Sequence, residues 1–285
     1  MNITKIYGPP GTGKTTELVR IARECLDLLP NNHVVFLSYT RAAAQEAASR
    51  IESPRLITST LHALAYRLMN LNAASVVNPN KLADFSQQTG IPFKDLKAGV
   101  EEPQEGDDYL SALSFAHNTG KFLTAEGSPS NPDSYEYAYD HFGRPGKHST
   151  WLMFIDAYHE WKNSNGYVDF DDMLMWLANS AHQATVRPGA TIILDEAQDC
   201  SPLQWAAFKR WSLTAGNLFI AGDDDQAIYE WNGADPHGME RFGRHQDIND
   251  RNIIVSTLKL SHRTPNSVYQ LVHEQILPNI NRRVQ

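Results

Sequence analysis

The spacing of apolar and polar positions differs between the two ends of the chain and its middle. Near the N-terminus, short apolar runs that suit buried strands lie at residues 3–7, 33–39 and 55–59, and each is followed by a segment with apolar residues at helical spacing. The same alternation returns later, with apolar runs at residues 190–194, 217–221 and 252–260. Strands that alternate with helices predict a parallel sheet covered by helices, which is an α/β fold.

The middle of the chain, residues 71–165, has a helical and loop-rich pattern instead. Breaks rich in glycine, proline, serine and asparagine interrupt it at residues 127–132 and 143–146. This pattern predicts a mostly helical subdomain inserted into a split α/β lobe. The lobe would be formed by residues 1–70 and 166–256, and we call these the lobe and residues 71–165 the insert.

A glycine-rich loop joins the first predicted strand to a helical pattern that stops at Pro30. In such a loop, backbone N–H groups turn towards phosphates, Lys14 supplies a point charge to the β and γ oxygens, and the Thr15 hydroxyl can bind Mg²⁺. The strand before it and the helix after it favour phosphate binding over a plain glycine-rich turn. The residues expected to bind a nucleoside triphosphate are Gly8, Pro9, Pro10, Gly11, Thr12, Gly13, Lys14, Thr15 and Thr16.

Composition narrows the class of protein. The chain has 285 residues and 41% apolar content, which is enough for a substantial core. A net charge of −8 argues against coating nucleic acid by bulk electrostatics, although a local groove can still bind it. The sequence lacks an apolar run long enough to span a bilayer and a signal-peptide pattern, so we expect a soluble, cytoplasmic protein.

Two adjacent acids, Asp195 and Glu196, end a buried-strand run at residues 192–194. Parallel sheets present their ligand sites at such strand ends. In a phosphate-loop protein, Asp195 would hold the metal and Glu196 would orient and deprotonate the attacking water. A solvated strand end with two acids is the alternative, and the residues that follow decide against it: the segment 195–199 reads DEAQD, and 222–234 reads GDDDQAIYEWNGA.

These segments resemble the motor of UvrD/Rep/PcrA-type superfamily 1 DNA helicases. Besides the phosphate loop, the DEAQD box and the GDDDQAIYEWNGA box, residues 60–62 are similar to the family's TxH motif, residues 38–44 to its TFTxxAA junction and residues 168–174 to its DFDDLL signature. The resemblance implies a RecA-like lobe that uses ATP and Mg²⁺ and moves 3′ to 5′ on single-stranded DNA.

The resemblance also implies roles for single residues. Gln226 would sense the γ-phosphate, and Tyr229 and Trp231 would be platforms on which bases of single-stranded DNA stack. Tyr39 takes a position where the family places an aromatic side chain against the strand, and core packing is an equal alternative for it. The residues expected to contact backbone phosphates are Thr40, Arg41, Thr60 and His62.

Residues 258–264 resemble the family's LxxNYRS segment, so Arg263 would neutralise charge that builds on the γ-phosphate. Ser261 and His262 replace the usual Asn-Tyr pair, and His262 would stack on the nucleotide base more weakly than a tyrosine does. The family's upstream glutamine segment has no counterpart here, because seven residues precede the loop.

By the same resemblance, residues 257–285 would begin a second RecA-like lobe that is largely absent. Because movement along DNA requires two lobes to close on ATP, we expect the chain alone not to unwind DNA. The missing lobe could sit on a second chain. Two other hypotheses stay open at this stage: a non-motor partner subunit or regulator that binds ATP and single-stranded DNA, and a different phosphate-loop enzyme such as a nucleotide kinase, which leaves the GDDDQAIYEWNGA box unexplained.

Overall fold

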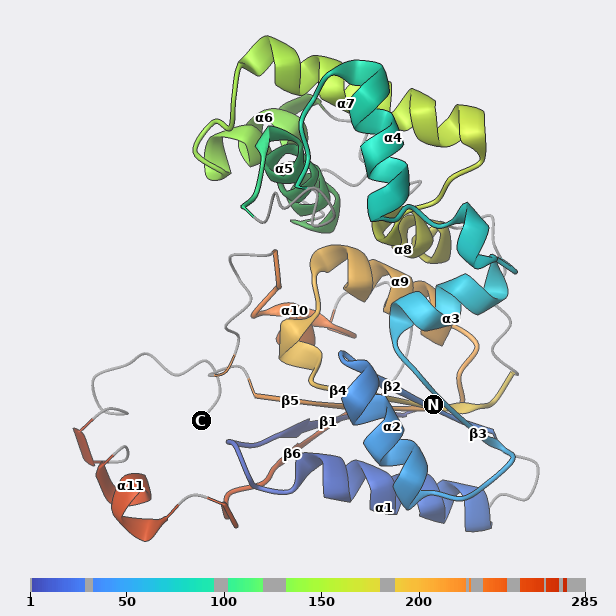
Figure 1. Cartoon of the computed structure of the whole chain (residues 1–285). Coiled ribbons are helices and arrows are strands. Elements are labelled where there is room, and N and C mark those ends of the chain that lie inside the picture. Colours follow the sequence, from blue (N-terminus) through green and yellow to red (C-terminus); the bar gives the residue numbers. More distant parts are fainter. Residues whose placement is uncertain are drawn as a thin grey trace.

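A computed structural model describes residues 2–28, 33–94, 102–119, 132–179, 188–223, 226, 233–244, 252–263, 265–271 and 274–275. The strands are β1 (Asn2–Tyr7), β2 (Val34–Ser38), β3 (Leu56–Ser59), β4 (Thr191–Asp195), β5 (Asn217–Gly222) and β6 (Asn252–Thr257). They form a parallel sheet in the order β3-β2-β4-β5-β1-β6 (Figure 1). The predicted α/β fold with a parallel sheet is confirmed.

Helices cover both faces of this sheet. They are α1 (Lys14–Leu28), α2 (Arg41–Arg50), α3 (Leu61–Leu68), α8 (Phe170–Ala178), α9 (Pro202–Ser212) and the short α10 (Gly238–Arg241), and the turn η2 (Ala197–Asp199) follows β4. In Figure 1, α1 lies below the sheet and α3, α9 and α10 above it, while α2 crosses in front of the strands and shares an apolar cluster with α1. The central strands β2 and β4 are buried along their whole length, because neighbouring strands and helices enclose them on all sides.

Two apolar clusters hold the sheet between its helices. On one face, Leu18 and Ala22 of α1 pack against Phe36 of β2 and Ile193 of β4, and Cys25 lies half-buried at the margin of this cluster. The cluster on the other face joins the sheet to α9, and its fully buried members include Ile3, Ile192, Leu203, Phe208, Leu218 and Ile220. The helix α9 begins where the sequence favours a helix start, since Ser201 caps it and Pro202 occupies its first turn.

The insert has a core of its own. Its elements are η1 (Ala73–Ser75), α4 (Pro79–Thr89), α5 (Glu105–Thr119), α6 (Pro132–His141) and α7 (His148–Asn165). Aromatic rings dominate that core, including Phe85, Tyr109, Trp151, Phe154, Tyr158 and Trp161. The two connections to the lobe run side by side, because Val76 and Val168 form a parallel bridge and the Val77 N–H donates to the Val168 carbonyl at 3.0 Å. The domain boundaries themselves stay a prediction.

The C-terminal part departs from the strand predicted at residues 252–260. The strand β6 ends at Thr257, because its partner strand β1 ends at Tyr7: the Leu258 N–H donates the last hydrogen bond of this pairing, to the Tyr7 carbonyl at 2.8 Å. A last helix, α11 (Asn266–Leu271), lies apart from the sheet in Figure 1. In the part of the chain that the structure describes, every helix is too short or too polar to cross a membrane.

Candidate functional site

The phosphate loop lies between the end of β1 and the start of α1, at the carboxyl edge of the sheet. Gly11 and Gly13 have φ angles of 75° and 85°, in the left-handed region that glycine adopts without strain. A Cβ atom on Gly11 would lie 2.5 Å from the Cβ of Arg263, so a larger residue does not fit there. The Thr12 hydroxyl donates to the Pro9 carbonyl at 2.8 Å and closes the turn.

Lys14 is buried at the first position of α1, with 8% of its surface exposed. Its Nζ donates to the Gly8 carbonyl at 2.6 Å, so the ammonium folds back over the loop. The positive charge and the N-terminal end of the helix dipole therefore act at the same place. Such a combination attracts an anion. Thr16 lies exposed in the first turn of α1, while Pro9 and Pro10 are half-buried in the loop.

Thr15 and Asp195 bring two oxygen atoms together beside the loop. The Thr15 hydroxyl donates to Oδ2 of Asp195 at 2.7 Å, although the two residues are 180 positions apart. Asp195 ends β4 and is buried, and burial raises the pKa of its carboxyl to about 6, with the neighbouring Glu196 adding to the rise and the Thr15 hydrogen bond opposing it. A hydroxyl and a carboxylate at this separation are hard oxygen donors of the kind that Mg²⁺ accepts, and its remaining positions go to phosphate and water. The residues present fit that ion.

Glu196 is held in an unusual conformation. Its φ angle is 55°, which a non-glycine residue rarely adopts, and its N–H donates to Oδ1 of Asp195 at 3.0 Å. Gln198 donates from Nε2 to Oε2 of Glu196 at 2.8 Å, and its Oε1 accepts the Asp223 N–H at 3.0 Å. Gln198 thus joins the end of β4 to the end of β5. Nothing in the sequence assigned it a role, although its place within the DEAQD box was a signal.

Gln226 is the one described residue between positions 224 and 232. Its side-chain amide donates to the carboxylate of Asp223, directly after β5, so it lies at the same edge of the sheet as Asp195. The predicted base-stacking residues Tyr229 and Trp231 lie outside the described residues. Their roles stay a prediction.

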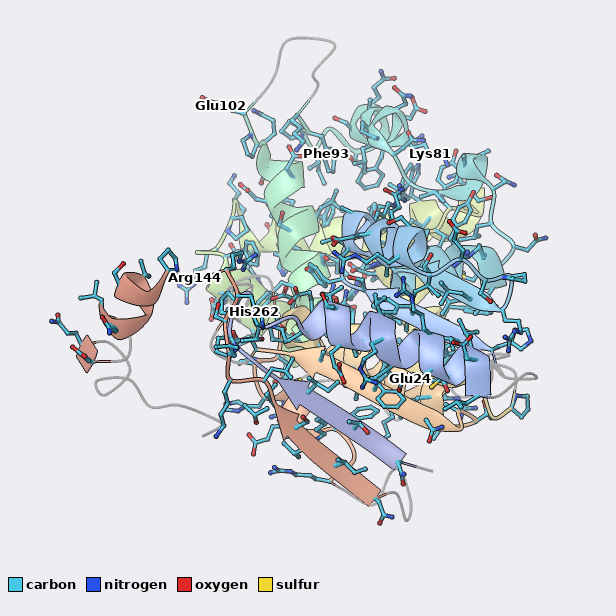
Figure 2. All side chains as sticks on the ribbon, turned by 90° about the horizontal axis from the view of Figure 1, so that it is seen from below. Glu24, Lys81, Phe93, Glu102, Arg144 and His262 are labelled. Atoms are coloured by element: carbon cyan, nitrogen blue, oxygen red, sulfur yellow. The ribbon has the colours of Figure 1, made fainter. Side chains whose placement is uncertain are left out.

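The segment after β6 reaches back to the phosphate loop. Hydrogen bonds attach it there: the Ser261 hydroxyl donates to the Pro10 carbonyl and the His262 N–H to the Gly11 carbonyl, each at 2.9 Å. His262 and Arg263 are exposed beside the loop, and Figure 2 labels His262 next to the first turn of α1. Ser261, which is a departure from the family pattern, therefore has a structural role that the sequence did not indicate.

A second group of predicted residues lies at the ends of β2 and β3. Thr40 caps α2 and Thr60 caps α3, and each hydroxyl accepts a backbone N–H at 3.2 Å. Arg41 is exposed at the first position of α2, and Tyr39 is half-buried before it. Helix starts with a neighbouring cation suit the phosphates of a nucleic-acid backbone.

These residues border a pocket of about 590 Å³ between α2, α3 and the start of α8. Arg41, Thr60 and His62 line one side, and Phe170 lines the other. The Phe170 ring meets the edge of His62 at 5.5 Å and is 55% exposed, which is unusual for a phenylalanine. Burial lowers the pKa of His62, so its ring is neutral at pH 7. Sequence reasoning missed Phe170, although it belongs to the DFDDLL-like segment.

Comparison with known proteins agrees with this geometry. A family model described as the UvrD/REP helicase N-terminal domain matches residues 2–247. DNA helicase II of Salmonella typhimurium is 28% identical over 255 residues, which cover 81% of this chain and 33% of that protein. The ATP-dependent DNA helicase PcrA of Bacillus subtilis is 25% identical over 297 residues, covering 96% of this chain and 37% of that protein. The chain spans about a third of the length of these curated relatives.

Proposed function

The chain belongs to the UvrD/REP helicase family, and we propose that it is the ATP-binding and ATP-hydrolysing motor lobe of an ATP-dependent DNA helicase. One observation carries the proposal: Lys14, the Thr15–Asp195 pair and Arg263 meet around the phosphate loop, although they come from distant parts of the sequence. Each of these groups suits one part of a bound nucleoside triphosphate. A purely structural role would not require all of them at the same place.

In this proposal the backbone N–H groups of Gly11, Gly13 and the first turn of α1 would surround the phosphates of ATP, and Lys14 would exchange its carbonyl partners for the β and γ oxygens. Thr15 and Asp195 would hold Mg²⁺, which neutralises charge on the phosphates. Glu196 takes a proton from the attacking water, and the hydrogen bond from Gln198 fixes the direction of its carboxylate.

The other predicted residues complete the nucleotide site. Gln226 would sense the γ-phosphate from the end of β5, and Arg263 would stabilise the charge that builds on it during hydrolysis. His262 would lie against the nucleotide base. Because both His262 and Arg263 are exposed, ATP would meet them from solvent without any rearrangement of the lobe.

Single-stranded DNA would bind along the same edge of the sheet. Thr40, Arg41, Thr60 and His62 would contact its phosphates, and the pocket between His62 and Phe170 gives a base an aromatic surface on which to stack. Tyr229 and Trp231 would provide further stacking, and Tyr39 would contribute from the end of β2. This arrangement places the DNA beside the ATP site.

Movement along DNA, its 3′ to 5′ direction and unwinding are further parts of the proposal. They would require a second RecA-like lobe, because the residues described here form one wall of the ATP cleft and closure of a second wall converts ATP binding into motion. That lobe would follow residues 257–285 or belong to a partner chain.

The test of the nucleotide site is binding of a fluorescent ATP analogue with Mg²⁺, followed by ATPase assays with and without single-stranded DNA. We expect Lys14→Ala to lose most of the nucleotide affinity, whereas Lys94→Ala, at an exposed position of the insert, keeps it. Glu196→Gln should bind the analogue normally and lose hydrolysis. Unchanged affinity in Lys14→Ala would show that the loop does not hold the phosphates, and unchanged turnover in Glu196→Gln would remove it as the base.

The DNA site is tested by titrating a labelled oligo(dT) strand. Phe170→Ala should weaken binding by about 1–3 kcal/mol if a base stacks on this ring. Arg41→Ala should weaken binding and make it less dependent on salt, whereas Arg144→Ala, a 72% exposed side chain on the insert, serves as the matched charge control. Equal affinities for all these proteins would exclude DNA from the pocket. ATP binding that persists without any DNA binding would favour a non-motor nucleotide-binding subunit.

A further inference from the structure

Helices α5 and α7 both contact the first turn of α8, through the side chains of an acidic run at residues 169–172. Asp169 caps α8 and, with Asp172, receives the buried ammonium of Lys162 from α7 at 2.6 and 2.7 Å. Asp171 points the other way, towards α5. This turn also carries Phe170, which lines the pocket proposed to take DNA.

Asn118 of α5 connects this turn to the nucleotide side of the molecule. Its Nδ2 donates to Oδ1 of Asp171 at 2.7 Å, and its Oδ1 accepts the Ser201 hydroxyl at 2.9 Å. An amide is suited to this place because it offers a donor at one end and an acceptor at the other. In the sequence, Asn118 is 53 positions from Asp171 and 83 positions from Ser201, so neither hydrogen bond belongs to a local turn or helix.

Ser201 is close to the groups proposed to hydrolyse ATP. It caps α9 two residues after η2, the turn that carries Gln198 and that Glu196 precedes. The preceding carbonyl, that of Cys200, accepts the Asp235 N–H at 2.9 Å. A displacement of Ser201 would therefore be passed to the turn that orients Glu196 and to the segment that follows Gln226.

Asn118 is also in contact with that second segment. A Cβ atom on Gly233 would lie 3.7 Å from the Cβ of Asn118 and 3.4 Å from the Thr119 side chain, which places the end of α5 against the backbone of residue 233. Gly233 has a φ angle of 85° and is buried. The end of α5 is thus fixed between three parts of the lobe: the start of α8, the start of α9 and the segment after β5.

We propose that Asn118 is a positioning residue that couples occupation of the pocket beside Phe170 to the nucleotide site. A ligand that presses on Phe170 moves the first turn of α8 and Asp171 with it. Asn118 then either follows Asp171 and shifts Ser201, or gives up a hydrogen bond in a half-buried place, where an unpaired amide is unfavourable. Either way the two sites favour the same arrangement of the bridge, so each ligand affects the affinity for the other equally. The inference rests on the proposed function, since it requires that ATP and DNA bind at these two sites.

The test compares the affinity for labelled oligo(dT) with and without a non-hydrolysable ATP analogue and Mg²⁺. In the wild-type chain we expect the two affinities to differ on the order of 5-fold or more, as is usual for coupled sites. In Asn118→Ala the difference should shrink to about 1-fold, with each ligand, measured alone, bound within about 2-fold of the wild-type affinity. If Asn118 only holds the insert in place, its substitution should change the free energy of unfolding and leave unchanged the ratio of the oligo(dT) affinities with and without the ATP analogue.

Ser114→Ala is the matched control. It removes another hydrogen bond to the same oxygen of Asp171, at 3.1 Å, but leaves the bridge from Asp171 to Ser201 in place. It should keep the wild-type ratio. The exchange variant Asn118→Asp with Asp171→Asn reverses the donor and the acceptor between the two positions and leaves a carboxylate oxygen for Ser201. It should restore the coupling that Asn118→Asp alone loses through repulsion between two carboxylates.

Each result decides a different point. Coupling that survives in Asn118→Ala, or that Ser114→Ala loses to the same extent, overturns the role of Asn118. A wild-type ratio of about 1 with both ligands bound overturns the coupling but leaves the proposed function intact. A wild-type chain that binds neither ligand overturns both. If Asn118→Ala does not fold, which thermal unfolding detects, the exchange variant against Asn118→Asp makes the same decision.

Discussion

Lys14 and Lys162 are both buried, but their positive charges have different partners. Lys162 is 3% exposed and lies between two carboxylates, and although burial alone would lower its pKa, Asp169 and Asp172 together raise it. Lys14 is 8% exposed, and the partners of its ammonium are carbonyl oxygens. The fold neutralises the first charge with two carboxylates in direct contact, whereas the hydrogen bonds of the second go to neutral carbonyls. A cation held in this way favours an incoming anion.

This contrast predicts different costs for the same substitution. Lys162→Met leaves Asp169 and Asp172 close together without their cation, so we expect a loss of about 2–4 kcal/mol in the free energy of unfolding. Lys14→Met should lose less than about 1 kcal/mol, because it removes an unpaired buried charge along with its hydrogen bonds. Urea unfolding of both variants in the absence of nucleotide measures this. Equal losses would mean that Lys14 is a structural lysine like Lys162.

At the scale of elements, packing of α5 against α7 places two imidazole rings together inside the insert. His117 of α5 and His159 of α7 lie with their ring centroids 5.9 Å apart and nearly parallel, at 14°. Burial, together with the neighbouring Lys162 and His117, lowers the pKa of His159 to about 4. The folded insert therefore keeps His159 neutral at a pH where the unfolded chain already carries a proton on it.

The insert should accordingly lose stability in acid. As the pH falls from 6.5 to about 4, the unfolded state takes up a proton that folded His159 refuses, so the free energy of unfolding falls across this window and levels off below it. Allowing for solvent at a partly exposed ring, we expect His159 to account for about 1–2 kcal/mol. Urea unfolding of the wild type and His159→Gln at pH 7 and pH 4.5 should show a smaller acid loss in the variant. Equal losses of unfolding free energy in the two proteins would mean that groups other than His159 cause the acid sensitivity.

At the scale of the whole molecule, the lobe and the insert have separate apolar cores, and a smaller apolar cluster joins Leu71 and Val76 of the insert to α3 and α8 of the lobe. Clusters on both faces of the sheet hold the lobe, whereas Tyr109, Trp151 and Phe154 belong to a cluster confined to α4–α7 and their connections. Figure 1 shows α4–α7 stacked on the side of α8 and α9 that faces away from the sheet. The division of the chain into a split lobe and an insert, which we propose from the sequence, predicts that the two cores respond independently.

Trp151→Ala tests that division. Trp151 is fully buried in the core of the insert, and its removal should cost about 3–5 kcal/mol. Amide hydrogen exchange should then show strongly reduced protection in α5 and α7 and much smaller changes in β2 and β4. Phe208→Ala, at a fully buried position between α9 and the sheet, is the reciprocal control and should affect β4 and β5 first. Uniform loss of protection in both variants would contradict two separate units.

Local pattern was sufficient for the elements and for the phosphate loop. The spacing of apolar residues predicts the strands and helices of the sheet. A central parallel strand is buried along its whole length and gives a continuous apolar run, whereas a covering helix is buried on one side and gives apolar residues at helical spacing. The glycines in the sequence predicted the phosphate loop, because Gly11 and Gly13 adopt a left-handed backbone conformation that other residues avoid. The DEAQD box likewise placed Asp195 and Glu196 at a strand end.

Tertiary structure alone decided which distant residues meet. Arg263 comes beside Gly11 because the segment after β6 turns back over the loop, and Asn118 joins Asp171 to Ser201 because α5 packs across the starts of α8 and α9. The resemblance of residues 258–264 to a family segment predicted Arg263 near the phosphates, whereas the Asn118 bridge has no signal in the sequence. Hydrogen bonds between residues more than 50 positions apart depend on how whole elements pack, and periodicity and turn chemistry report only on a few neighbouring residues. The sequence determined the chemistry that this protein carries, and packing determined where that chemistry converges.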